Sequence, residues 1–215
     1  MKKINLKTIR KKILNIAIKY APINGWNYKL ITLISNKSKF TEKEINALFP
    51  EGYKSILRFY LLESNVEFTK ASKKLSLIRM KTSERIKQLI LLKIKINAQN
   101  KLLIKKIFFT LLLPNHSKLA SLSLFKTVDQ IWFLAGDNST DFNYYTKRAT
   151  LALIYSSTVF FWINNNYNYY KTEKFLDQQL LKIYKISKIK SKLNYFKESV
   201  PNIFSILKNF NFIKQ

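Results

Sequence analysis

Few side chains in this chain of 215 residues have the types and spacing that catalysis requires. Asp137 and Asp141 lie four residues apart and could share a metal ion, but the chain offers one histidine, His116, and no cysteine to complete a transition-metal site. His116 could join a Ser-His-Asp arrangement, yet no nucleophile elbow, glycine-rich phosphate loop or dinucleotide fingerprint occurs. Turn formation and helix capping account for both aspartates. We therefore predict no catalytic residue, no metal site and no enzymatic activity.

The two aspartates belong to a polar joint between two aromatic-rich helical segments, at residues 127–149. Gly136 supplies the backbone that ends the first helix, and Asp141 is placed to cap a second helix over residues 142 to about 163. Exposed aromatic residues beside polar groups are typical of binding hot spots, so we predict that a protein partner docks on the joint. The alternative is that the aromatic residues belong to the core and the polar ones cap the helices. The predicted docking residues are Asp137, Asn143, Tyr144, Tyr145 and Lys147.

The composition favours helix throughout the chain. Three glycines and four prolines leave few helix breakers, and Leu, Ile, Lys, Asn and Glu dominate where strands would want Val and Thr. We predict an all-α chain in three parts. These are a helix-turn-helix-like N-terminal unit at residues 1–55, a helical lipid-binding domain at 56–186, and a basic connector with an amphipathic helix at 187–215.

The first 55 residues have the layout of a TetR-type helix-turn-helix. Thr41, followed by Glu44 at the third helical position, forms a capping box at the start of the third short helix. A recognition helix meets base edges with its first residues, and here Glu42 and Glu44 would bring carboxylates toward phosphate oxygens. We expect a scaffold rather than sequence-specific DNA binding; a TetR-class DNA-binding transcriptional regulator is the alternative function.

The joint also carries the clearest resemblance to a known family. Residues 135–152, AGDNSTDFNYYTKRATLA, resemble the signature of the ubiquinone (coenzyme Q) biosynthesis accessory lipid-binding family called Coq nine, which has a TetR-like fold. Ala21-Pro22, Gly25-Trp26, residues 48–52 and residues 175–177 look like further landmarks of that family. Tyr144 departs from the pattern, because a tryptophan stands there in many relatives.

The resemblance implies a non-catalytic accessory protein. Such a protein binds an isoprenoid quinone precursor at the membrane and presents it to a modifying enzyme, which in the family is the di-iron demethoxyubiquinone hydroxylase. We accordingly expect a bound isoprenoid lipid or quinone precursor and no other cofactor. A homodimer is expected as well.

Apolar side chains of the middle helices are numerous enough to form a pocket, although periodicity alone does not distinguish a pocket from an ordinary core. The helix over residues 149–163 is apolar nearly all round but shorter than the ~20 residues that a membrane span needs. Ser83 is expected to cap an earlier helix on which Lys93 belongs to a basic face. The resemblance favours a pocket, and its predicted lining residues are Phe108, Leu112, Ile131, Trp132, Tyr155 and Phe160.

A formal net charge of +27, from 39 basic and 12 acidic residues, favours an anionic partner. Nucleotide bias is the competing explanation, because the enriched residues Lys, Asn, Ile, Tyr and Phe all have AT-rich codons. The N-terminus lacks the features of a signal peptide. We expect a cytoplasmic protein on the bacterial inner membrane, or on the matrix side in a mitochondrion, held on anionic lipid by the C-terminal helix. The alternative is that this helix packs on the protein's own core. Its predicted membrane-binding residues are Ile203, Phe204, Leu207 and Phe210.

Overall fold

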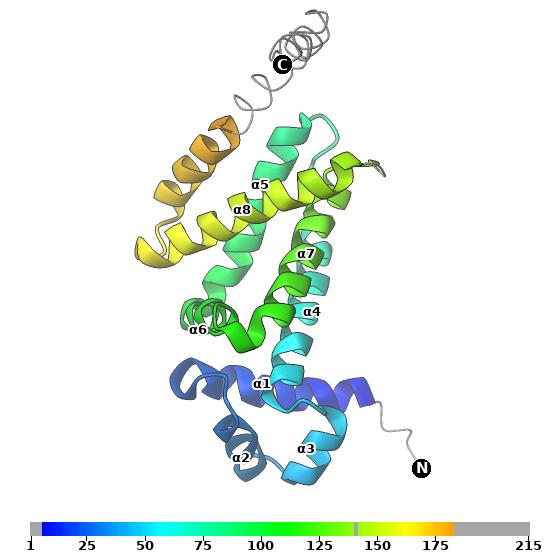
Figure 1. Cartoon of the computed structure of the whole chain (residues 1–215), viewed down its shortest axis with the longest axis vertical. Helices are drawn as coiled ribbons and strands as arrows, with labels where there is room; N and C mark the ends of the chain where they lie inside the picture. Colours follow the sequence, from blue (N-terminus) through cyan, green and yellow to red (C-terminus); the bar gives the residue numbers. More distant parts are fainter. Residues whose placement is uncertain (1–5, 140–141, 183–215) are drawn as a thin grey trace, which may run out of the picture.

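The computed structural model describes residues 6–139 and 142–182, and within these ranges all regular structure is helical (Figure 1). This confirms the all-α prediction. The predicted membrane-binding residues and Asp141 lie outside the described residues. None of the described helices is both long and apolar enough to cross a bilayer. The described α-helices are α1 (Leu6–Asn24), α2 (Lys29–Asn36), α3 (Glu42–Leu48), α4 (Tyr53–Ser72), α5 (Thr82–Asn97), α6 (Lys101–Leu111), α7 (Ser117–Leu134), α8 (Phe142–Asn164) and a helix at 169–182, which is the last one described and is called the last helix below.

The N-terminal unit contains α1, α2 and α3, which pack around the start of α4. The capping box predicted for α3 is present: Thr41 Oγ1 accepts a hydrogen bond from Glu44 N at 3.3 Å, and Glu44 Oε2 accepts one from Thr41 N at 2.8 Å. Gly52 has a φ of +57°, a backbone conformation that disfavours side chains, and it turns the chain from α3 into α4. The apolar cluster of this unit also includes Leu103 and Ile107 of α6, so the unit is packed onto the rest of the molecule.

A second apolar cluster lies between α4, α5, α7, α8 and the last helix. In Figure 1, α4 rises out of the N-terminal unit and runs beside α7, while α8 crosses α5 and α7. Trp162 is fully buried in this cluster, and Phe161 of α8 stacks on Phe175 of the last helix with ring centroids 4.3 Å apart. These contacts hold the last turn of α8, whereas its first turns are bonded to the end of α7.

Two expectations about α5 are wrong. The helix starts at Thr82, and the residue that precedes it, Lys81, donates its backbone N–H to Glu84 Oε2 at 3.1 Å, so Ser83 is not the cap. Lys93 is buried rather than placed on a basic face. The reason is its spacing: Lys93 follows Leu89 and Ile90 by four and three residues and therefore shares their apolar face.

Candidate functional site

The joint between α7 and α8 begins with a Schellman motif at the end of α7. Gly136 has a φ of +88°, and its N–H donates to Phe133 O at 3.0 Å, while the N–H of Asp137 donates to Trp132 O at 3.0 Å. A Cβ atom at position 136 would lie 3.0 Å from Nη1 of Arg85, which donates to Ala135 O. Gly136 therefore satisfies both the backbone and the packing requirement, and the helix end predicted there is confirmed.

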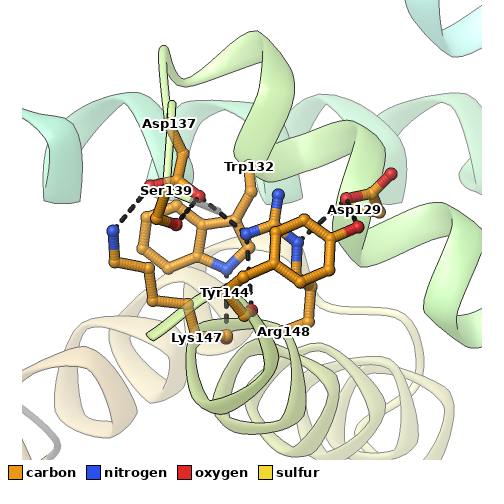
Figure 2. Close-up of polar contacts among 7 residues, drawn as sticks. All are labelled: Asp129, Trp132, Asp137, Ser139, Tyr144, Lys147 and Arg148. Atoms are coloured by element: carbon orange, nitrogen blue, oxygen red, sulfur yellow. Dashed lines mark hydrogen bonds and ion pairs between the residues drawn. The ribbon is translucent and has the colours of Figure 1, made fainter. Parts of the chain in front are cut away.

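Asp137 is the centre of a polar network inside the joint (Figure 2). Its Oδ1 accepts a hydrogen bond from Lys147 Nζ at 2.6 Å, and its Oδ2 accepts from Arg148 Nη1 at 2.6 Å and from Ser139 Oγ at 2.7 Å. The side chains of Asp137 and Arg148 are each 5% exposed. Burial opposes ionisation of Asp137, but the hydrogen bonds from Lys147, Arg148 and Ser139 outweigh it and hold the pKa of this carboxyl well below its usual range.

Arg148 joins this network to α7. Its Nε donates to Asp129 Oδ1 at 2.9 Å, and the hydroxyl of Tyr144 donates to the same oxygen at 2.9 Å. The guanidinium carbon lies 3.6 Å from the centroid of the Tyr144 ring, a cation–π distance. The hydrogen bond to Asp129 raises the pKa of the Tyr144 hydroxyl. One arginine therefore connects α7, the turn and α8.

The five predicted docking residues occupy different environments. Tyr145 is 66% exposed and packs edge-on against Tyr144, with ring centroids 5.1 Å apart. Lys147 lies partly over the Trp132 ring, and Trp132 Nε1 donates to the Lys147 carbonyl at 3.0 Å. Asp137 is buried in the network, and the side chain of Asn143 lies outside the described residues. Among the described side chains of this set, Tyr145 is therefore the one that is free to contact a partner across most of its surface.

A groove of about 820 Å³ runs from this joint along α4 and α7. Asp129, Tyr144 and Arg148 line its end at the joint, and Phe133, which is 75% exposed, lines it from α7. An exposed phenylalanine beside charged and phenolic groups is the surface composition expected of a protein-binding patch.

A separate cavity of about 200 Å³ lies between α4, α5, α6, α7 and α8. Its apolar wall comes mainly from α6, with Ile104, Ile107 and Phe108, and Leu112 follows that helix at the mouth. Leu112 is 63% exposed, so the cavity reaches the surface beside α6. The polar part of its lining, called the polar end below, includes Ser64, Asn65, Lys93, Asn97 and Tyr155.

The structure brings together half of the residues predicted to line a lipid pocket. Phe108, Leu112 and Tyr155 line the cavity, and Phe160 stacks on Phe108 with ring centroids 5.9 Å apart. Ile131 is fully buried in the second apolar cluster. Trp132 lies at the joint instead.

The residues that sequence reasoning missed are mainly Asp129, Lys93 and Asn97. Asp129 is the one acidic residue in α7, and Arg148 is the one arginine after Arg85 in the sequence. This isolation was the signal that the two could form an ion pair. Lys93 and Asn97 recur at helical spacing with apolar residues of α5, and this spacing was the signal that they face inward.

Within the described residues, no group of three His, Cys, Asp or Glu side chains is arranged to hold a metal ion. The buried His116 is engaged instead with Tyr53, whose hydroxyl lies 3.2 Å from its Nε2.

A solved structure with a similar fold is the TetR transcriptional regulator from Nitrosomonas europaea, at a TM-score of 0.65 and 19% identity over 81% of this chain and 97% of that chain. At this identity the likeness concerns the fold alone, and it confirms the predicted TetR-like fold.

Sequence comparisons find similarity to one protein family. A family model described as COQ9 matches residues 118–187, which contain most of α7, the joint and α8. The human protein "Ubiquinone biosynthesis protein COQ9, mitochondrial" is 29% identical over 157 residues, 70% of this chain and 49% of the human protein. The Xenopus laevis protein COQ9-A is 27% identical over 180 residues, 80% of this chain and 56% of that protein. The chain thus spans about half the length of the curated relatives it matches. The family model and these relatives confirm the resemblance to the COQ9 family that the sequence of the joint predicts.

Proposed function

We propose that this chain acts in ubiquinone biosynthesis as a non-catalytic protein that binds an isoprenoid quinone precursor and presents it to a modifying enzyme. The names of its relatives support the pathway. The observation that carries the binding role is the cavity beside α6, which has an apolar wall, a polar end and an opening to the surface.

The size of the cavity limits what it can hold. Binding sites for whole small molecules commonly measure ~300–1,000 Å³, and this cavity measures about 200 Å³. It therefore suits a head group and the first part of a tail. The remainder of the tail would leave past the exposed side chains of Phe109, Leu112 and Leu113, which are 42%, 63% and 51% exposed.

This arrangement fits the physical problem of a membrane-dissolved substrate. A polyprenyl tail is stabilised in the bilayer by burial of its apolar surface, at ~0.8 kcal/mol per CH₂ group. A protein that covers the part of the tail nearest the head group offsets much of the cost of lifting the head out of the lipid. The rest of the tail can stay in the membrane.

Filling the cavity is expected to abolish binding. Ala120 lines the cavity from α7, whereas its neighbour Ser121 is exposed. Ala120→Trp therefore places an indole ring in the cavity, and Ser121→Trp places the same ring on the surface. A ubiquinone analogue with a ten-carbon tail, added at ~100 times its Kd, should raise the Tm of the native chain and of Ser121→Trp by roughly 5–10 °C. Ala120→Trp should show no shift.

Circular dichroism of the two variants without ligand provides the control for folding. Native mass spectrometry of the gently purified native chain gives a second readout, because a bound isoprenoid lipid adds its mass. If the native chain carries no lipid and the analogue does not raise its Tm, the proposed binding role is wrong.

We further propose that the modifying enzyme, a demethoxyubiquinone hydroxylase or an equivalent, docks on the joint. The groove beside the network and the exposed rings of Tyr145 and Phe133 support this assignment. Docking here would place the enzyme against α7 and α8, two of the helices that also line the cavity.

Tyr145→Ala is expected to weaken binding of the hydroxylase at least tenfold without changing Tm by more than ~1 °C, because the ring is exposed. Tyr144→Ala should instead lower Tm, since it removes the hydrogen bond to Asp129 and the ring beneath Arg148. Affinity can be measured by surface plasmon resonance. Tyr170→Ala is the matched control, because Tyr170 is 64% exposed on the last helix, beyond the far end of α8. Equal losses for Tyr145→Ala and Tyr170→Ala would contradict docking at the joint.

Attachment to a membrane and a homodimer also belong to this proposal. The relatives are named as mitochondrial proteins, which supports a place on the matrix side of a mitochondrial membrane or its bacterial counterpart. A DNA-binding regulator is the less favoured function, because the exposed carboxylates of Glu42 and Glu44 stand at the N-terminus of α3.

A further inference from the structure

The polar end of the cavity contains a buried lysine. Lys93 is 4% exposed, and its Nζ donates hydrogen bonds to Ser64 O at 3.0 Å, Ser64 Oγ at 2.9 Å and Asn65 Oδ1 at 2.9 Å. All three acceptors are neutral. None of the ion pairs among the described residues includes Lys93.

A buried ammonium without an anionic partner is unfavourable, because neutral acceptors replace only part of its hydration. Burial lowers the pKa of Lys93 to about 7, and the charge of Glu67 on α4 opposes this only partly. Among the described residues that line the cavity, the other titratable groups are the phenols of Tyr60 and Tyr155, and burial raises the pKa of both. The free cavity therefore has a positive site that lacks a matching negative charge.

The neighbours of Lys93 contribute further polar groups to the polar end. Asn97 lies one helical turn further along α5, and its side chain is hydrogen-bonded to the Tyr155 hydroxyl. Thr127 on α7 donates to Asn65 Oδ1 at 3.4 Å. The polar end thus offers one cation together with hydroxyl and amide groups. This combination suits an oxygen-bearing head group.

We propose that Lys93 binds the head group, and that the cavity selects amphiphiles whose head carries an anionic oxygen, a carboxylate or an ionised phenol. The inference rests on the proposed lipid-binding function and assigns the chemical class of the ligand. One of the three N–H groups of Lys93 turns from Ser64 or Asn65 to the ligand oxygen, and the apolar tail lies against Ile104, Ile107 and Phe108 of α6.

The test compares an acid with its neutral counterpart on the same tail. Suitable probes are 4-decyloxybenzoate and its methyl ester, with each Kd measured by calorimetry on the full chain at pH 6.5. The acid should bind roughly ten- to a hundredfold more tightly than the ester, as expected for a charge-assisted hydrogen bond in a buried site. Lys93→Met should remove this preference and leave the ester's Kd nearly unchanged. Lys95→Met removes the same formal charge from an exposed position of α5 and should keep the preference.

A second measurement needs no variant. The benzoate stays ionised from pH 6.5 to pH 9, while free Lys93 loses its proton over this range, so the affinity for the acid should fall and that for the ester should not. Equal binding of acid and ester by the native chain, or an acid preference that persists in Lys93→Met, would overturn the assignment of Lys93. If the ester still binds in those cases, the proposed lipid-binding function stands. If neither probe binds, that function fails together with the inference.

Discussion

Replacing Arg148 with methionine is expected to lower the Tm of this chain by on the order of 10 °C. The guanidinium is 5% exposed and holds the carboxylates of both Asp129 and Asp137. Removing one partner of a buried ion pair costs ~3–5 kcal/mol. The lower end of this range applies here, because Asp137 keeps its hydrogen bonds from Lys147 and Ser139. Each kcal/mol shifts Tm by ~2–4 °C in a domain of this size. Differential scanning calorimetry measures the change.

Lys147→Met is the matched control for Arg148→Met. Lys147 also contacts Asp137 at 2.6 Å, but its side chain is 38% exposed, so its loss should cost much less. The double variant Asp137→Asn with Arg148→Met should be more stable than the sum of the single losses predicts, since the two side chains interact directly. Additive losses would show that Arg148 acts independently of Asp137 and would contradict the network.

The same network makes the folding stability of the chain depend on pH in the acid range. The folded-state pKa of Asp137 is depressed, so its contribution to stability is fully present above the unfolded pKa of ~3.9 and is lost as the pH falls through the lower folded value. Asp137→Asn should therefore remove part of the loss of stability below pH 4. An unchanged acid slope in this variant would mean that other carboxylates cause it.

Local features of this fold could be predicted from the sequence because their causes lie within a few residues. The capping box joins Thr41 to Glu44, three residues apart, and the end of α7 depends on Gly136 alone for its positive φ. The helical composition and the aromatic-rich joint could be predicted equally well, because neither prediction requires knowledge of tertiary contacts.

The interior of the site could not be predicted in the same way. Lys93 is hydrogen-bonded to Ser64 and Asn65, which lie 29 and 28 residues away in the sequence. A hydrophobicity pattern counts lysine as polar and therefore predicts that it lies on the surface. Whether an apolar residue lines a cavity or fills the core depends on helix rotation, which is why Phe108 faces the cavity whereas Ile131 is packed in the core. The sequence places Arg148 in the joint. Its second partner, Asp129, could not be predicted because it lies 19 residues away on α7.

The buried lysine also predicts an unusual dependence of stability on pH. The pKa of Lys93 is about 7 in the folded chain, whereas an unfolded lysine titrates near ~10.4. The unfolded chain thus binds the proton more tightly, so the charged lysine costs folding free energy. This cost is fully present below pH 7, shrinks as the pH rises and is absent above the unfolded pKa. Its direction is opposite to that of a lysine whose pKa is raised by an ion pair.

Lys93→Met is therefore expected to be at least as stable as the native chain at pH 6.5, and to lose that advantage by pH 10. Relative to the variant, the native chain should gain roughly 1–4 kcal/mol of unfolding free energy over this interval, because the variant has no proton to lose at that position. Urea titrations at several pH values give the difference directly, and the general loss of positive charge at high pH cancels in it. Lys95→Met, on the exposed side of α5, should show no such movement. A constant difference between Lys93→Met and the native chain from pH 6.5 to pH 10 would mean that Lys93 keeps its proton throughout. The cavity would then hold a permanent positive charge, and the acid preference would not weaken at pH 9.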